Sequence, residues 1–223
     1  MKTIARWAIS SLLLELLLAA AAVAAAPPAP AAAPVDDVMA GMEKAGAALK
    51  TYAADFTKER VFVIAEDREE TGGKFFYAKP GKILWEFERP ASRSVLIEPG
   101  QVTTFDPRIK QLQRLKLPQA KSEFQVIGFG TSKKAMTDTY VVELLGQDSD
   151  AYHLRLIPRK IEESMFARFE LWIDRKTFVP SKIKLYEKST DETTITFTNA
   201  VVNPAISSSR FKISPPPGTD IIE

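Results

Sequence analysis

The chain has 223 residues, no cysteine, 30 basic and 28 acidic side chains, and a formal net charge of +2. Without cysteine it can form no disulfide and cannot carry the lipid-modified cysteine of a bacterial lipoprotein, so packing alone must stabilise the fold. The near balance of charge gives no argument for nucleic acid or an anionic membrane surface as a partner.

The first 26 residues have the layout of a secretory signal peptide. Lys2 and Arg6 precede a leucine-rich run over 9–18, which an alanine-rich run follows. The apolar run is too short for a bilayer core of ~30 Å, and Glu15 interrupts it. We therefore expect residues 1–26 to be cleaved and the mature protein to be exported and soluble. The alternative is an uncleaved anchor, because two prolines obscure the cut site.

The mature chain is expected to form one domain behind a short spacer. Residues 27–34 read PPAPAAAP, and such a Pro/Ala tract is extended and solvated. Residues 35–223 suit a single domain with a sizeable core, since single all-β domains commonly reach this size.

The first predicted element is an amphipathic helix over 36–52, with Asp36 or Asp37 as its N-cap. Apolar residues recur there at helical spacing and form one stripe. The stripe consists of Val38, Met39, Met42, Ala45, Leu49 and Tyr52.

Short β-type runs follow and are separated by turn residues. The predicted strands are 55–65, 72–79, 82–88, 93–98, 102–106, 110–117, 139–146, 151–158, 166–174, 180–188 and 192–202. The turn signals are Gly72 with Gly73, Pro80 with Gly81, Pro99 with Gly100, Asp106 with Pro107, and 148–150. A spacing of about ten residues predicts an antiparallel meander or barrel of about ten or eleven strands. Region 118–138 breaks this rhythm and is expected to hold a loop and a short helix near 132–136.

Alternation along the strands gives each one an apolar and a polar face. Ile83, Trp85 and Phe87 share one face, while Glu86 and Glu88 take the other. A single long sheet of this kind must curl around something apolar, and one modest helix cannot fill the space. The pattern therefore predicts a ligand cavity; the alternative is a core filled by its own side chains.

The predicted cavity lining comes from the helix and from one face of the strands. Trp85 could equally be a plain core anchor. The lining is Met39, Met42, Leu49, Trp85, Phe87, Leu96, Phe169, Leu171, Ile183, Leu185, Ile195 and Phe197.

Enzymatic chemistry finds little support in the sequence. His153 is the single histidine and lies on the polar face of a predicted strand, so it reads as a surface residue. No serine stands in a G-x-S-x-G context, and no zinc ligand set can be assembled. Asp148 and Asp150 flank a serine in what reads as a hairpin turn, not a calcium loop. We expect no enzyme activity, catalytic residue, metal or cofactor.

Several segments form a characteristic series when they are taken in their order along the chain. The longest is 73–90, GKFFYAKPGKILWEFERP, which has a basic residue before Pro-Gly and then a Leu-Trp pair. The others are VLIEPG at 95–100, FDP at 105–107, FG at 129–130, YVVELL at 140–145, LRLIP at 154–158, LWID at 171–174, FVP at 178–180 and FKISPPPG at 211–218. Together they cover nearly the whole mature chain, and in this order they resemble the LolA-type periplasmic carriers of outer-membrane lipoproteins.

The resemblance implies a mainly β fold, an incomplete and strongly curved antiparallel β-barrel with a helical lid on its concave side. It also implies a carrier that binds the acyl chains of lipoproteins in an apolar cavity and shuttles them from the inner to the outer membrane. The implied partners are lipid-modified proteins, an inner-membrane ABC-type release complex and an outer-membrane acceptor, and the implied state is a monomer.

Two points are left open by the resemblance. The family often carries arginine where Lys79 stands, and that arginine ties the lid shut, so Lys79 is expected to be a weaker lid latch or else a surface lysine. The alternative function is a periplasmic module that senses lipids or lipoproteins with the same fold. A sensor is expected to bring a second domain or a tether, so the carrier is favoured.

Overall fold

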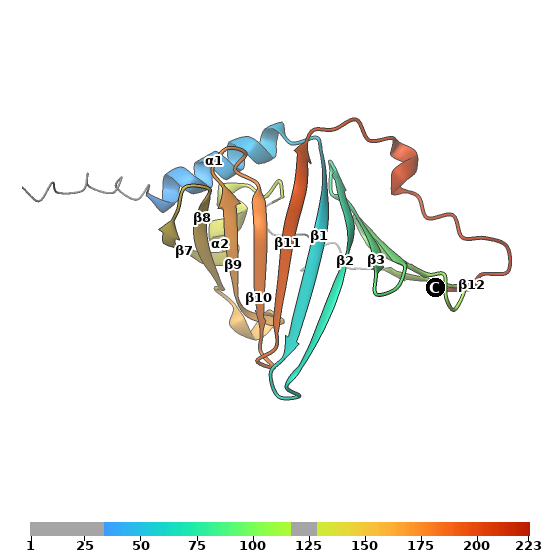
Figure 1. Cartoon of the computed structure of the whole chain (residues 1–223). Helices are drawn as coiled ribbons and strands as arrows, with labels where there is room; N and C mark the ends of the chain where they lie inside the picture. Colours follow the sequence, from blue (N-terminus) through green and yellow to red (C-terminus); the bar gives the residue numbers. More distant parts are fainter. Residues whose placement is uncertain (1–33, 117–128) are drawn as a thin grey trace, which may run out of the picture. The chain divides into compact units, whose positions relative to one another are not determined.

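The computed structural model describes residues 34–116 and 129–223, which belong to the unit Ala32–Glu223 (Figure 1). The predicted signal peptide, nearly all of the predicted spacer and the loop over 118–128 lie outside the described residues. In the part that is described, no helix is long and apolar enough to cross a membrane.

Helix α1 (Val35–Ala48) packs on the sheet through buried Val38, Met39 and Met42. The predicted helix over 36–52 was too long at its C-terminal end, because Tyr52 already pairs with strand residues on both sides. The predicted aspartate cap was also wrong. Pro34 is the N-cap and has no side-chain cap, while both aspartates lie in the first turn. There their charges still complement the helix dipole.

In the described part of the chain, twelve strands follow, with one short α-helix and two 3₁₀ turns between them. The strands are β1 (Thr51–Phe62), β2 (Asp67–Ala78), β3 (Lys82–Arg89), β4 (Arg93–Glu98), β5 (Gln101–Asp106), β6 (Gln111–Lys116), β7 (Tyr140–Gln147), β8 (Ala151–Pro158), β9 (Phe166–Asp174), β10 (Pro180–Glu187), β11 (Glu192–Val202) and β12 (Asp220–Ile222). The other elements are α2 (Lys133–Thr139), η1 (Ile161–Glu163) and η2 (Ser208–Phe211).

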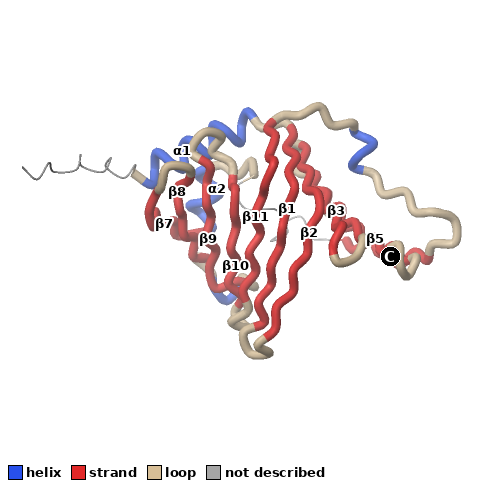
Figure 2. The backbone as a smooth tube through the Cα atoms, viewed as in Figure 1, coloured by secondary structure: helices blue, strands red, loops and turns tan. Residues whose placement is uncertain are grey.

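All twelve described strands form one sheet, in the order β12-β6-β5-β4-β3-β2-β1-β11-β10-β9-β8-β7 (Figure 2). Neighbouring strands are antiparallel, except that β12 runs parallel to β6. The order ends at β12 and β7, so the sheet does not close on itself. This confirms the predicted incomplete antiparallel barrel; β12 was missed because three residues carry no alternation.

Two predicted boundaries around the first hairpin were wrong. Gly72 and Gly73 were expected to form a turn, but they lie inside β2, where the register against β3 shifts. A Cβ atom on Gly73 would lie 1.9 Å from the Glu86 carbonyl oxygen, so the close approach of β3 requires glycine there. The turn instead precedes β2, and Glu66 takes a positive φ of 52° in it.

The two faces of the sheet differ in what covers them. We call the face that carries Phe75 and Leu171 the inner face; α1 packs against it, and it holds the main core. In Figure 1, α1 runs across one end of β7–β11, and β1, β2, β10 and β11 extend well beyond it.

The opposite, outer face carries a second, smaller apolar cluster over β3 and β4. Phe211 of η2 packs there on Leu84 and Leu96. Arg210 forms an ion pair with Glu86 beside it. The segment after β11 thus crosses the outer face before it supplies β12 to the sheet edge.

Candidate functional site: the inner face and its helix

The inner face is lined by an aromatic cluster over the central strands. Phe56 and Phe75 contact the Trp85 ring with centroid distances of 4.8 and 4.5 Å, and Phe87 lies 5.2 Å from Phe56. Phe197 of β11 joins them, 5.0 Å from Phe75. Strand alternation places these rings together, because residues two apart share a face.

Most of the predicted lining residues meet on this face. Eight of them are buried in the main core: Met39, Met42, Leu49, Trp85, Phe169, Leu171, Ile183 and Phe197. Three more are partly buried against it: Phe87, Leu185 and Ile195. They pack against one another and against α1.

Leu96 is the one predicted lining residue that the structure places elsewhere. It lies opposite Leu84 in the β3–β4 register and shares that residue's outer face. The residues of β4 that pack against the main core are Val95 and Ile97. An apolar run such as that of β4 does not reveal which of its residues face inward.

Sequence reasoning missed the residue that fills the centre of the face, Phe129. Its ring lies 5.0 Å from that of Tyr52, 5.4 Å from Phe75 and 5.7 Å from Phe197. Phe129 comes from the loop before α2, which has no periodicity to mark an inward residue. Tyr52 and Phe75 were also left out, although the alternation of Tyr52, Ala54 and Phe56 was a usable signal.

Lys79 holds the C-terminal end of α1. Its Nζ donates to the carbonyl oxygens of Gly46 at 3.2 Å and Ala47 at 3.0 Å, both in the last turn of the helix. An ammonium is favourable there because the terminal carbonyls lack helical partners and carry the negative end of the dipole. Asn203, not predicted, adds a second anchor by donating from Nδ2 to the Ala48 carbonyl at 3.2 Å.

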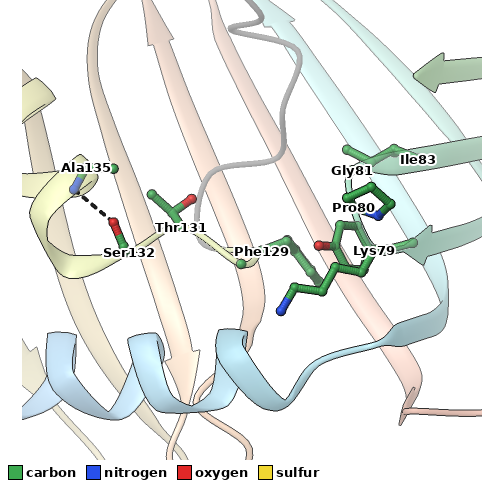
Figure 3. Close-up of a pocket in the computed structure, with 10 residues that line it drawn as sticks. Lys79, Pro80, Gly81, Ile83, Phe129, Thr131, Ser132 and Ala135 are labelled. Carbon is green, nitrogen blue, oxygen red and sulfur yellow. Dashed lines mark hydrogen bonds between the residues drawn. The ribbon is translucent and has the colours of Figure 1, made fainter. Parts of the chain in front are cut away.

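A cavity of about 410 Å³ opens beside this contact (Figure 3). It is lined by Tyr77, Lys79, Pro80, Gly81, Ile83, Phe129, Gly130, Thr131, Ser132 and Ala135. In Figure 3 the Lys79 side chain points from this cavity toward α1. Ser132 caps α2 there by accepting a hydrogen bond from the Ala135 N–H at 3.1 Å, so the short predicted helix is confirmed.

The tyrosine hydroxyls of this site carry no charge. Burial raises the pKa of the Tyr77 hydroxyl, and burial, with Asp174 as a lesser cause, raises the pKa of Tyr52, so both remain neutral. Among residues 34–116 and 129–223, no group of His, Asp and Glu is placed to hold a metal ion. What this arrangement offers chemically is apolar surface.

His153 lies away from this site, on the outer face. Its Nε2 is 2.9 Å from Glu170 Oε2, and its ring stacks on Trp172 at 4.1 Å. These contacts form a cross-strand ladder, which is a structural role.

The comparisons with known proteins agree with the fold. Residues 47–214 match the family model described as outer membrane lipoprotein carrier protein LolA. An outer-membrane lipoprotein carrier protein of Methylococcus capsulatus is 26% identical over 174 residues, covering 78% of this chain and 82% of that protein. One from Chromohalobacter salexigens is 26% identical over 185 residues, covering 82% and 86%.

A solved structure shares the fold at low sequence identity. It is an uncharacterised conserved protein from Thermus thermophilus, with a TM-score of 0.56 at 13% identity, covering 84% of this chain and 98% of that one. The family consists of periplasmic carriers with lipoprotein cargo and not of enzymes. This confirms the prediction from the sequence that the chain is not an enzyme. Since the family model matches well over half of its residues, the chain belongs to the LolA family of outer-membrane lipoprotein carriers.

Proposed function

We propose that this protein is exported, loses residues 1–26, and carries lipoproteins across the periplasm by holding their acyl chains against the inner face. Residues 27–34 are the spacer and 35–223 the carrier domain. The observation that carries the proposal is an aromatic inner face under a helix whose end is held by the Lys79 ammonium.

Apolar area supplies the driving force for such binding. Each CH₂ removed from water gains ~0.8 kcal/mol, so even one long acyl chain offers a gross gain well above the ordering costs of binding. In the structure, side chains such as Phe129 occupy the inner face. Acyl chains therefore replace contacts that the inner-face side chains otherwise make with one another, which keeps net binding weak enough for release.

Opening requires α1 to move, and its contacts are suited to that. Val38, Met39 and Met42 bury one side of the helix, while alanine and glycine make up much of the rest. Lys79 and Asn203 add a few hydrogen bonds at one end. We propose an inner-membrane ABC-type release complex as donor and an outer-membrane receptor as acceptor, with the protein acting as a monomer and without nucleic acid.

The mature protein, without residues 1–26 and therefore without Trp7, keeps two tryptophans. They allow a direct test, because Trp85 lies on the inner face and Trp172 on the outer one. The probe is a triacylated peptide with brominated acyl chains, which quench only nearby indoles. Trp172→Phe leaves Trp85 as reporter and should show strong quenching; Trp85→Phe leaves Trp172 and should show little. Equal quenching of both, or none, would contradict inner-face binding.

Transfer must be measured separately from binding. Protein loaded with a fluorescent triacylated peptide is mixed with acceptor vesicles, and release is followed over time. A carrier hands its load over at a measurable rate. Binding without transfer, even to envelope membranes that contain the native acceptor, would instead favour the lipid- or lipoprotein-sensing module.

A further inference from the structure

The inner face changes character beyond the aromatic cluster. Along β1, Lys58 and Arg60 continue the face that carries Phe56, since residues two apart point the same way. On β4, the Arg93 guanidinium lies 4.6 Å above the Phe87 ring. We call Lys58, Arg60 and Arg93 the inner rim.

The three cations of the inner rim differ in their partners. Arg60 is neutralised, because it pairs with Glu187 at 3.0 Å and with Asp191 at 3.4 Å. For Lys58 and Arg93, no carboxylate of the described residues lies within ion-pair distance. Two open cations therefore border the aromatic wall.

Lys58 is held where its charge is costly. Burial lowers the pKa of its amine first; Glu69 and Glu187 act against this, whereas Arg60 and Arg93 lower the pKa further. This half-buried ammonium lies near two guanidiniums. An added anion therefore stabilises its positive charge more than it stabilises the charge of an ordinary surface lysine.

We propose, on the basis of the carrier function above, that Lys58 and Arg93 bind acidic residues next to the acylated cysteine of the cargo. Acyl chains on the aromatic wall would place the cargo's peptide at its polar border. The backbones of the two strands that carry these cations are three interstrand steps apart, about 14 Å along the sheet, but the two charges lie close enough for Arg93 to lower the pKa of Lys58. The acylated cysteine of the cargo belongs to a peptide, so the group that the carrier function brings to this border is the peptide next to that cysteine, and a lipid headgroup is the other anion to be tested.

The test compares two triacylated peptides that differ only in the two residues after the cysteine, Glu-Glu or Gln-Gln. Each displaces a fluorescent fatty acid from the exported protein at low salt. We expect the acidic peptide to bind about fivefold more tightly, as for two partly exposed ion pairs. The preference should weaken as salt is raised.

Variants locate the preference on the rim. In Lys58→Gln with Arg93→Gln, both peptides should bind equally, while Lys176→Gln, in the exposed β9–β10 turn, should keep the preference. Lys58→Arg keeps the positive charge and should also keep the preference for the acidic peptide. This variant therefore distinguishes an effect of charge from an effect of altered folding. Equal binding of both peptides to the wild type, or a preference that survives in the double variant, overturns the proposal.

Two further outcomes have defined meanings. If neither peptide displaces the probe from any variant, the carrier function itself fails, and not only the charge preference. A second arm compares lysophosphatidylglycerol with a monoacylglycerol of the same chain. If the double variant changes the discrimination between these lipids but not between the peptides, the anion is a lipid phosphate and the peptide proposal is overturned.

Discussion

Lys79 is the residue whose predicted role is most directly visible as a contact. Its ammonium reaches two carbonyls at the end of α1, but the residue is exposed, so solvent weakens both hydrogen bonds. The structure also shows that Asn203 shares the task. A single substitution should therefore loosen the helix end without releasing it.

We expect Lys79→Met to speed amide hydrogen exchange in residues 36–48 by roughly fivefold, about 1 kcal/mol for hydrogen bonds from an exposed charged donor. Adding Asn203→Ala should increase the effect. Lys79→Arg should slow exchange and acyl-peptide transfer, because the guanidinium fork can reach both carbonyls at once. If protection of residues 36–48 from hydrogen exchange is unchanged in both Lys79 variants, Lys79 is only a surface lysine.

Lys79 stabilises the folded protein, whereas Lys58 is expected to destabilise it at neutral pH. Because its folded-state pKa lies below the unfolded value, the unfolded chain holds more protons between the two, and stability rises with pH in that window. Lys58→Met should thus stabilise the protein at pH 7 by about 1 kcal/mol. This stabilisation should shrink above pH 10.5, the ordinary pKa of a lysine, because the wild-type amine is then neutral in both states. Urea unfolding at about pH 7 and about pH 11, on either side of that pKa, checks it, and a destabilised variant at neutral pH contradicts it.

At the scale of elements, α1 and the loop before α2 approach each other through two glycines. A Cβ atom on Gly46 would lie 3.0 Å from Gly130 Cα, which is backbone and cannot rotate away. The same loop carries Phe129 into the aromatic cluster. The seating of the helix and the placement of this ring are therefore coupled.

Gly46→Ala should push α1 from the loop and raise hydrophobic-dye binding, at a cost of about 1–2 kcal/mol in stability for an overpacked contact. The matched control is Gly146→Ala in β7, where no atom lies within 4 Å of the added methyl group. The control should bind dye like the wild type. If both variants behave alike, the glycine contact has no role in seating α1.

For the molecule as a whole, the two faces of the sheet should separate stability from binding. Phe211 is 6% exposed and covers Leu84 and Leu96 on the outer face, across the sheet from the aromatic cluster. Phe211→Ala should lower the free energy of unfolding by about 3 kcal/mol. Its affinity for acylated peptide, measured below the unfolding temperature, should stay within twofold of the wild type, and a large loss would link the two faces.

Local pattern was sufficient for the class of fold but not for its register. The alternation of Ile83, Trp85 and Phe87 correctly identified the inner face of β3. The next strand could not be assigned in this way, because Val95, Leu96 and Ile97 are all apolar and only pairing with β3 decides which face each takes. Phe129 was not predicted for a similar reason, since its position depends on the tertiary contacts of a loop.

The junction between β1 and β11 has a consequence for how the chain acquires its structure. Tyr52 pairs with Val202, so two neighbouring strands near the middle of the sheet come from nearly opposite ends of the described chain. Contacts so distant in sequence make folding slow, because a long loop must close before they form. If the N-terminus crosses the membrane first, β1 can pair with β2 at once, but its other edge stays unpaired until β11 has emerged. Refolding from denaturant should accordingly take milliseconds to seconds, with a yield that falls as protein concentration rises.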